Sequence, residues 1–370
     1  MRFLIVSHAQ HFNSHGETYS YGPYVKEMNI WLKHVDEVEI IAPITERAPS
    51  IIDQAYIKKI TLTSIPEISL ISVFQIIRAL FFAPLIMFRI YKGMKRADHI
   101  HLRCPGNIGL LGCMVQILFP SKPKTAKYAG NWDPDSKQPW SYKFQKYILS
   151  NTFLTKKIKV LVYGNWQNQS KNIVPFFTAS YTNADKQEVP LRKYDLPLRF
   201  LFVGSLTKGK RPLYAIKLVK GLMNAGYPSE IHVYGNGIVN EEIENYIKEN
   251  KLQELVYIHG AQSSQVIEEA YKKTHFLILP SKSEGWPKVV AEAMWWGVIP
   301  IVTSVSCVPW MLGNGSRGIL IKGKFKKDIK RIEGDLKNKN ALRTKSHKAQ
   351  LWSRQFTLDR FENEIAKFLK

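Results

Sequence analysis

A strand, a loop, a helix and a second strand follow one another in the last third of the chain, and this unit constrains the fold most. Residues 275–279 (H-F-L-I-L) form a short apolar run of strand length, which Pro280 ends. From Lys288 apolar residues recur at steps of three and four, which predicts a helix, and Gly297 is expected to end it. Residues 298–302 predict a second buried strand. Such units build open parallel sheets with helices on both faces.

Two glutamates occupy positions where a sheet of this kind binds ligands. Glu284 falls on the loop after the first strand, and Glu292 lies one to two turns into the helix. Ligands of open parallel sheets bind at the carboxyl ends of the strands, close to the free N–H groups and positive dipole of helix N-termini. The pattern therefore predicts a ligand that carries both phosphates and hydroxyls. The alternative is a pair of solvated glutamates, one on a loop and one on a helix face.

The segment S-E-G-W-P-K-V-V-A-E-A-M, with seven residues between the glutamates, resembles the signature of retaining GT-B glycosyltransferases. It is most similar to glycosyltransferase family 4 (group 1), in the branch that builds bacterial surface polysaccharides. The resemblance implies that Glu284 is catalytic, as a positioning or electrostatic group near the donor sugar, and that Glu292 binds the donor ribose. It further implies that Lys288 and Val289 hold the donor diphosphate and that Trp286 borders the cleft.

A second segment that resembles the family is the strand–helix turn at residues 200–212, F-L-F-V-G-S-L-T-K-G-K-R-P. Relatives clamp the donor pyrophosphate here with an arginine and a lysine. The arginine position is Ser205 in this chain, so Lys210, with Lys208 or Arg211, is expected to carry the charge. Gly235, in E-I-H-V-Y-G-N-G, matches the family's G-x-G loop at the same cleft. A solvated basic turn is the alternative for this segment.

The first half of the chain matches more weakly. Residues 2–7 and 38–42 predict parallel strands, and residues 24–32 predict the helix between them. Relatives carry a glycine-rich loop before this helix, where the backbone approaches the donor phosphates or the acceptor. Only Gly16 and Gly22 are available here, so the segment is either part of the cleft or an ordinary strand–helix turn.

Residues 97–103 predict a strand whose end resembles the family's D-x-x-H-x-H segment. The resemblance implies that His101 is catalytic and that Arg103, in place of the last histidine, points at the acceptor or sugar. A histidine in a structural role is the alternative. Asn131 stands where many relatives have a histidine that touches the donor sugar.

The resemblance implies the GT-B fold, two doubly wound Rossmann-like α/β domains with an interdomain cleft. The expected acceptor-binding domain covers residues 1–183, a polar linker covers 184–197, and the nucleotide-sugar domain covers 198–351. A C-terminal helix within 352–370, with the pattern W-x-x-x-F-T…F-x-x-x-I, is expected to pack back on the first domain.

The net charge of the chain restricts the classes of partner that it is expected to bind. A net charge of +23 suits nucleic acid, an anionic membrane or anionic small molecules, but no nucleic-acid-binding motif accompanies it. The apolar stretch 68–94 contains charged residues and Pro84, so we expect either a helix docked on the membrane interface or a core helix, and not a buried membrane span. Three scattered cysteines and no signal peptide predict a cytoplasmic protein in peripheral contact with an anionic membrane.

These features together predict a retaining glycosyltransferase that moves a sugar from a UDP- or GDP-linked donor to a lipid-linked or oligosaccharide acceptor. No cofactor or metal is expected, because lysines and a helix N-terminus replace Mg²⁺; the nearest D-x-D match, Asp133–Pro134–Asp135, lies in the other domain. Two alternatives are a GT-B nucleotide-sugar epimerase or phosphorylase, and a non-enzymatic basic protein that binds polyanions.

Overall fold

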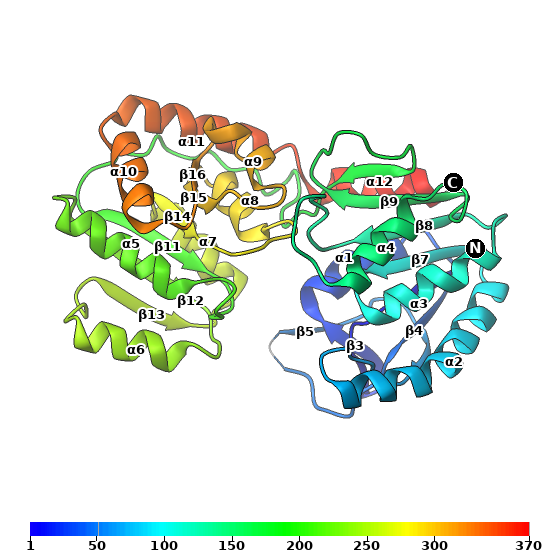
Figure 1. Ribbon diagram of the computed structural model, residues 1–370. Helices are drawn as coiled ribbons and strands as arrows, with labels where there is room; N and C mark the ends of the chain where they lie inside the picture. Colours follow the sequence, from blue (N-terminus) through cyan, green and yellow to red (C-terminus); the bar gives the residue numbers. More distant parts are fainter. Residues whose placement is uncertain (51, 370) are drawn as a thin grey trace. The chain divides into compact units, whose positions relative to one another are not determined.

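The computed structural model describes residues 1–50 and 52–369. By its internal contacts the chain forms two compact units, which are described one by one (Figure 1). The first comprises residues 1–177 and the end of the chain from Phe361, and the second comprises residues 178–360.

The first unit is built on a seven-stranded parallel sheet with the order β10-β9-β8-β7-β1-β4-β6. Its strands are β1 (Arg2–Val6), β4 (Glu37–Pro43), β6 (Thr61–Ile65), β7 (His99–Cys104), β8 (Lys124–Tyr128), β9 (Ile158–Tyr163) and β10 (Ile173–Phe176). Its helical segments are α1 (Gly22–Leu32), α2 (Val73–Arg96), α3 (Asn107–Val115), η1 (Gln116–Leu118), α4 (Trp140–Ser150) and most of α12 (Leu358–Leu369).

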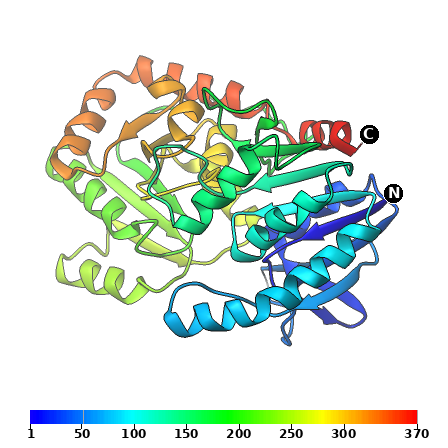
Figure 2. The same cartoon turned by 45° about the vertical axis from the view of Figure 1, so that its right-hand side comes forward.

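Both faces of this sheet are covered, as is usual for parallel sheets. Alternate residues such as Leu4 and Leu102 enter a core under α2, α3 and α4, which lie side by side (Figure 2). The intervening residues face the other way, where His101 packs against Trp31 of α1 with ring centroids 4.6 Å apart. A parallel strand buried on both sides therefore hides polar residues as well as apolar ones.

The segment predicted as a glycine-rich loop is instead a β-hairpin. β2 (His11–Ser14) pairs with β3 (Glu17–Tyr21), and β3 pairs with β5 (Asp53–Ala55). Gly16, with φ of +80°, lies in the hairpin turn. Gly22 begins α1 and donates its N–H to Ile52 O at 2.8 Å, where a Cβ would stand 2.8 Å from that oxygen. Both glycines thus have local backbone roles.

Helix α2, expected as either an interfacial helix or a core helix, has one buried side and one exposed apolar side. One side, with Ile86, Ile90 and Met94, is completely buried against the sheet. The other side exposes large apolar residues to solvent, including Phe74 and Phe81, which are 76% and 78% exposed. Among the described residues, α2 is the one helix long and apolar enough to cross a membrane by length and composition.

The second unit has a six-stranded parallel sheet with the order β13-β12-β11-β14-β15-β16. Its strands are β11 (Leu198–Val203), β12 (Ser229–Tyr234), β13 (Val256–Gly260), β14 (Phe276–Leu279), β15 (Ile299–Thr303) and β16 (Ile319–Ile321). Its helical segments are α5 (Pro212–Asn224), α6 (Asn240–Glu249), α7 (Ser264–Lys273), α8 (Lys288–Trp295), α9 (Val308–Met311), η2 (Gly313–Gly315), α10 (Phe325–Leu336) and α11 (Lys339–Ser353). The predicted class, two doubly wound α/β domains, is confirmed.

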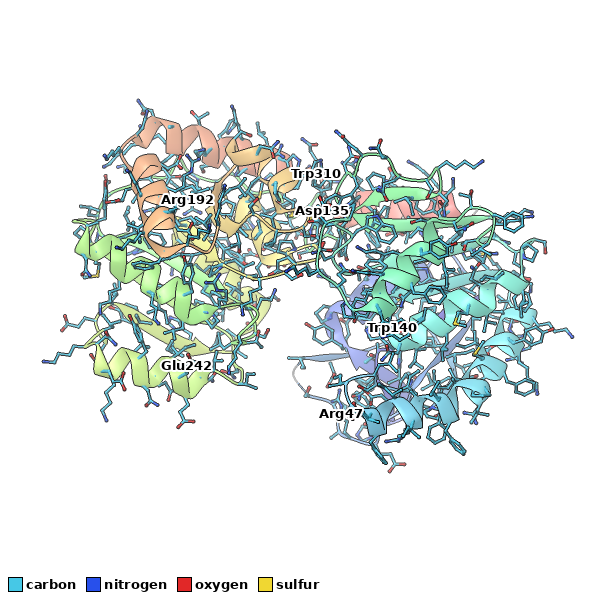
Figure 3. All side chains as sticks on the ribbon, in the orientation of Figure 1. Arg47, Asp135, Trp140, Arg192, Glu242 and Trp310 are labelled. Carbon is cyan, nitrogen blue, oxygen red and sulfur yellow. The ribbon has the colours of Figure 1, made fainter. Side chains whose placement is uncertain are left out.

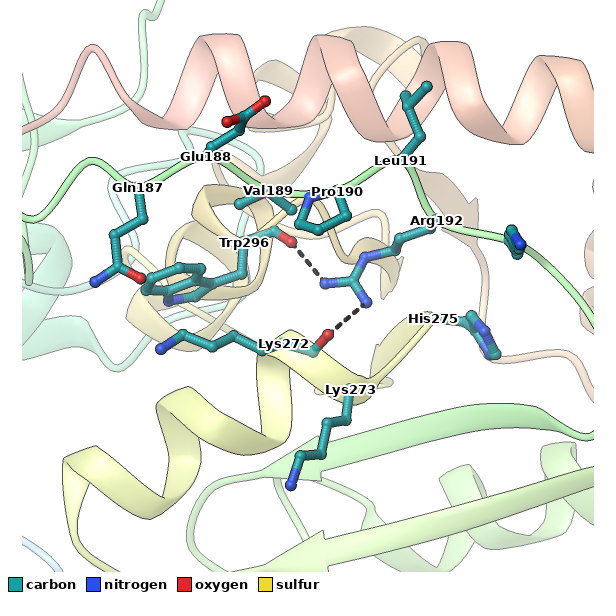
Figure 4. A pocket seen from close by; sticks show the side chains of 11 residues that line it. Gln187, Glu188, Val189, Pro190, Leu191, Arg192, Lys272, Lys273, His275 and Trp296 are labelled. Carbon is teal, nitrogen blue, oxygen red and sulfur yellow. Dashed lines mark hydrogen bonds between the residues drawn. The ribbon is translucent and has the colours of Figure 1, made fainter.

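Residues 184–197, expected as a linker, lie within the second unit, and Arg192 attaches them to it (Figure 4). Its guanidinium donates to five backbone carbonyls, those of Tyr271, Lys272, Thr274, Trp296 and Gly297. The first three carbonyls end α7 and the last two end α8. One cation therefore satisfies the free carbonyls and the negative dipole ends of two helices. Burial lowers the pKa of Arg192 to about 10.

We predict that Arg192→Met lowers the free energy of unfolding of the second unit by about 3 kcal/mol, because buried carbonyls lose a charged donor. Lys193→Met removes the same charge from an exposed neighbour and should have little effect. Urea denaturation of both variants measures the difference; equal stabilities would contradict the double-capping role.

A buried neutral histidine makes the stability of the first unit depend on pH. The His11 ring lies 2.8 Å from Ala9 O through Nδ1 and 2.8 Å from the Tyr56 hydroxyl through Nε2. Burial lowers the pKa of His11 to about 4 from an ordinary 6.5. The unfolded chain therefore takes up the proton first as the pH falls, so this contribution to stability is complete above pH 6.5 and declines toward pH 4.

We predict that His11→Gln flattens the loss of stability between pH 7 and pH 4.5 by roughly 2 kcal/mol, as followed by urea denaturation at several pH values. His347→Gln, at an exposed position, is the matched control and should retain the slope of the parent protein. Identical slopes for all three proteins would show that His11 does not titrate on unfolding.

Candidate functional site

Two loops meet at the carboxyl edge of the second sheet through an ion pair. Lys210 lies on the loop between β11 and α5, and Glu284 lies on the loop between β14 and α8. Lys210 Nζ is 2.6 Å from Glu284 Oε1 and 2.9 Å from Oε2. β11 and β14 are neighbours in a parallel sheet, which brings these strand ends together. A cation and a carboxylate predicted from separate motifs are thus in contact.

The loop that carries Glu284 is fixed by hydrogen bonds on both sides of it. Lys282 N donates to Gly209 O at 2.9 Å, which links it to the Lys210 loop. Thr303 Oγ1 donates to Ser281 O at 2.6 Å, and the Cys307 thiol donates to Gly285 O at 3.0 Å. Burial raises the pKa of Cys307 to about 12, so this thiol stays protonated and able to donate. Glu284 is therefore held in position before any ligand arrives.

Glu292 is half-buried on α8 and is held by two hydroxyl groups. Ser180 Oγ donates to Oε1 at 2.5 Å, and Tyr271 OH donates to Oε2 at 3.2 Å. Burial, and then the charge of Glu292, raise the pKa of Tyr271 well above its usual range, so its hydroxyl remains a donor. A carboxylate has about four acceptor positions, so Glu292 can still accept bonds from further hydroxyls.

The N-terminus of α8 lies between the two glutamates. Its N-cap residue, Pro287, supplies no side-chain hydrogen bond to the first turn. Lys288 and Val289 are the first two residues of the helix, and Lys288 lines a small hollow together with Glu292. Amides in the first turn of a helix are donors for anions. The predicted diphosphate-binding residues thus lie one turn from Glu292.

Two other predicted residues near Lys210 have different surroundings. Ser205 is exposed on the same loop. The guanidinium of Arg211 lies 4.1 Å from the centre of the Tyr214 ring and fills the space beside Gly323. Lys210, rather than Arg211, is therefore the cation in contact with Glu284.

Gly235 brings a third loop to this edge. Its φ is +139°, and a Cβ would lie 2.0 Å from Gly204 O. Gly235 N donates to Gly260 O at 2.7 Å. The turns after β11, β12 and β13 can approach this closely only with glycine at position 235.

Trp286 belongs to an aromatic cluster in the second unit. Its ring stacks on Trp352 with centroids 6.0 Å apart and contacts Trp310, labelled in Figure 3, and Phe356. Trp286 is 7% exposed. Its large side chain therefore anchors the Glu284 loop from within the unit.

In the first unit, the carboxyl edge of the sheet carries a separate polar cluster. Arg103 Nη1 lies 2.6 Å from Glu27 Oε1, and its guanidinium lies 5.4 Å from the centre of the Tyr24 ring. His8 follows β1 at the same edge; loss of water contact and the charge of Arg103 lower its pKa. Arg103 thus lies next to the last residue of β7, at the carboxyl edge of the sheet, and its role toward the acceptor or sugar stays a prediction.

His101 is placed differently from what a site role requires, whereas the expected place of Asn131 beside the donor sugar stays a prediction. The His101 ring is completely buried, and Nδ1 lies 2.8 Å from Thr125 Oγ1. A structural role therefore replaces the predicted catalytic one, because no substrate reaches this ring. Asn131 Oδ1 accepts from Asp133 N at 2.9 Å and closes the turn that leads to Asp135, labelled in Figure 3.

Sequence reasoning did not identify Ser180, Tyr271 or Cys307 as parts of the site. Ser180 and Cys307 each make one hydrogen bond to a motif residue, and Tyr271 OH makes two, to Val289 O and Glu292 Oε2. The spacing of Tyr271 in the sequence predicts a buried helix position, and it does not predict that the Tyr271 hydroxyl bonds to Glu292. Within residues 1–50 and 52–369, no group of three or more His, Cys, Asp or Glu side chains is arranged to hold a metal ion.

Comparison with known proteins finds glycosyltransferases among the relatives of this chain. The family model described as Glycosyl transferases group 1 matches residues 183–350. The chain is 33% identical to the lipopolysaccharide 1,6-galactosyltransferase of Salmonella typhimurium over 119 residues. This alignment covers 31% of this chain and 32% of that protein. It is 26% identical to an uncharacterised glycosyltransferase of Methanocaldococcus jannaschii over 161 residues, an alignment that covers 43% of this chain and 44% of that protein. The chain thus matches less than half the length of these two relatives.

Solved structures match the whole chain. The Anabaena protein HepE, in complex with UDP and glucose, has a TM-score of 0.68 at 13% identity and covers 100% of this chain and 99% of its own. Sucrose-phosphate synthase from Thermosynechococcus elongatus has a TM-score of 0.67 at 14% identity, with coverage of 99% and 97%. The fold is therefore that of the GT-B proteins, and residues 183–350 match the model of the group 1 glycosyl transferases.

Proposed function

We propose that the protein is a retaining glycosyltransferase of family 4 that transfers a sugar from a nucleotide diphosphate sugar to a hydroxyl of a lipid-linked or glycan acceptor in surface-polysaccharide synthesis. The observation that carries the proposal is the contact between Lys210 and Glu284. The N-terminus of α8, at Lys288, lies between Glu284 and Glu292 in the chain. The lipopolysaccharide transferase relative supports the surface-polysaccharide role. UDP is the favoured nucleotide because the solved relatives include complexes with UDP.

The chemistry requires neutralisation of a leaving diphosphate. Lys210, Lys288 and the open first turn of α8 supply positive charge and N–H donors for it. The bond from the anomeric carbon to the diphosphate oxygen breaks, and that oxygen accepts the proton of the attacking acceptor hydroxyl on the same face. Glu284 stabilises the positive charge that develops on the sugar, and Glu292 holds the ribose hydroxyls. We propose that these groups act without a metal ion.

We predict that Glu292→Gln weakens binding of the preferred UDP-sugar by roughly 10- to 100-fold, because a neutral amide replaces a charged acceptor of ribose hydroxyls. Glu242→Gln makes the same change at an exposed position on α6 and should bind normally (Figure 3). Calorimetry with a panel of UDP-, GDP- and ADP-sugars, with and without EDTA, measures both. Product NMR should show retained anomeric configuration. Binding to none of these donors, or equal affinities of the two variants, would contradict the proposal.

We also propose that the first unit contacts an anionic membrane through α2. The solvent-facing side of this helix exposes Val73, Phe74, Ile77, Leu80, Phe81 and Phe88. Its C-terminal half carries Arg89, Lys92, Lys95 and Arg96. Apolar residues beside cations are typical of helices that lie in the membrane interface. This arrangement would bring the enzyme to a lipid-linked acceptor.

We predict that the double variant Phe74→Ser, Phe81→Ser weakens binding to phosphatidylglycerol vesicles at least about tenfold, because two large apolar side chains no longer enter the bilayer. The control, Leu191→Ser, Leu351→Ser, removes exposed leucines from the second unit and should bind like the parent protein. Vesicle co-sedimentation measures both. If the two double variants bind alike, α2 is not the docking element.

A further inference from the structure

A hollow in the first unit is lined by six lysines and lies at the opposite edge of the sheet from Arg103. It measures about 510 Å³ and opens beside the first residues of β8 and β9 and just before β10. Since β9 has six residues, its two ends lie roughly 17 Å apart. The hollow is therefore separate from the ligand-binding edge. Its lysines are Lys124, Lys156, Lys157, Lys159, Lys171 and Lys367.

The charge of this hollow is not balanced by its walls. Among the described residues that line it, none is an aspartate or glutamate. Lys367 pairs with Glu364 at 2.8 Å, outside the lining. The remaining lining residues are neutral and include the Thr152 and Thr155 hydroxyls and the Asn172 amide. Like charges gathered in one concavity raise the local positive potential, and this potential attracts anions.

Lys124 is a buried cation in the wall of the hollow. Its side chain is almost completely buried, and its Nζ donates to Phe119 O at 2.6 Å. Burial, and then the charge of Lys157, lower the pKa of Lys124 to about 8. Lys124 N also donates to Lys157 O at 2.9 Å, which keeps these two residues next to each other. An anion in the hollow would relieve the repulsion between them.

An exposed aromatic residue stands in the loop that forms one wall. Phe153 is 80% exposed and lies between the lining residues Thr152 and Thr155. Lys156 Nζ is 5.7 Å from the centre of its ring. A solvent-exposed phenylalanine beside a cationic hollow fits a ligand that has an apolar part next to its charge.

We propose that this hollow is a binding site for phosphate groups, distinct from the donor site, and that the phosphates are those of an anionic lipid headgroup or of a soluble polyphosphate. Phosphate oxygens accept several charge-assisted hydrogen bonds at once, which matches lysines that converge from four chain segments. Phe153 favours the lipid source, with its ring among the acyl chains. The site does not depend on the proposed transfer reaction.

The site is tested by lysine acetylation followed by peptide mass spectrometry, with tripolyphosphate as the probe. We expect tripolyphosphate to slow acetylation of Lys156, Lys159 and Lys171 at least about fivefold, while exposed lysines of the second unit, Lys327 and Lys330, react unchanged. Because the readout is specific to each lysine, binding at Lys210 in the donor site is distinguished from binding here. Absence of protection in the first unit at low ionic strength overturns the proposal.

Matched variants then identify the source of the phosphate. The triple variant Lys156→Gln, Lys159→Gln, Lys171→Gln should lose about tenfold in affinity for tripolyphosphate, whereas Lys324→Gln, Lys327→Gln, Lys330→Gln, with the same net charge, should not. Equal losses would show non-specific attraction to a basic protein and would overturn the site.

Binding to vesicles that contain cardiolipin in phosphatidylcholine tests whether the ligand is a lipid headgroup. If the hollow variant and Phe153→Ser both weaken vesicle binding while Phe153→Ser binds tripolyphosphate normally, the ligand is a lipid headgroup. If the hollow variant loses only tripolyphosphate binding, the site is supported with a soluble phosphate as its ligand.

Discussion

The ion pair between Lys210 and Glu284 is the constraint on which the candidate site depends. It joins loops from two adjacent parallel strands, and Lys282 N to Gly209 O joins the same loops through their backbones. A donor diphosphate would therefore meet a cation that is already in position but is shared with a carboxylate. In the proposed reaction, Lys210 would be shared between Glu284 and the diphosphate, and donor binding would thereby change the charge next to the sugar. This pairing brings the charged residues of the two sequence motifs into contact.

The sequence was most informative where local rules act alone. Pro280, the helical spacing from Lys288 and the stop at Gly297 predicted a strand, a loop and a helix, and the structure has β14, then α8 starting at Lys288, then Gly297 with φ of +68°. Proline and glycine restrict the backbone whatever surrounds them, so these boundaries could be predicted. The position of the glutamates followed from the same boundaries.

Prediction failed where the outcome depended on distant segments. The turn at Gly16 became a hairpin because β5, more than thirty residues later in the chain, adds a third strand to it. His101 lies in a strand covered on both faces, and an alternating pattern cannot show that the polar face is also buried. Ser180 and Tyr271 reach Glu292 from a non-helical segment and from a different helix. These contacts are products of the tertiary fold and leave no local signal.

Arg192 has a consequence for the order in which the second unit is completed. Its carbonyl acceptors come 79 to 105 residues later in the chain. During synthesis, which starts at the N-terminus, the guanidinium is made long before the ends of α7 and α8. The full set of five hydrogen bonds can form only after Gly297 has been added, because two of the acceptors, Trp296 O and Gly297 O, end α8. The complete contact therefore joins segments of high sequence separation, and a single side chain ties residue 192 to both sides of β14 and the Glu284 loop in the chain.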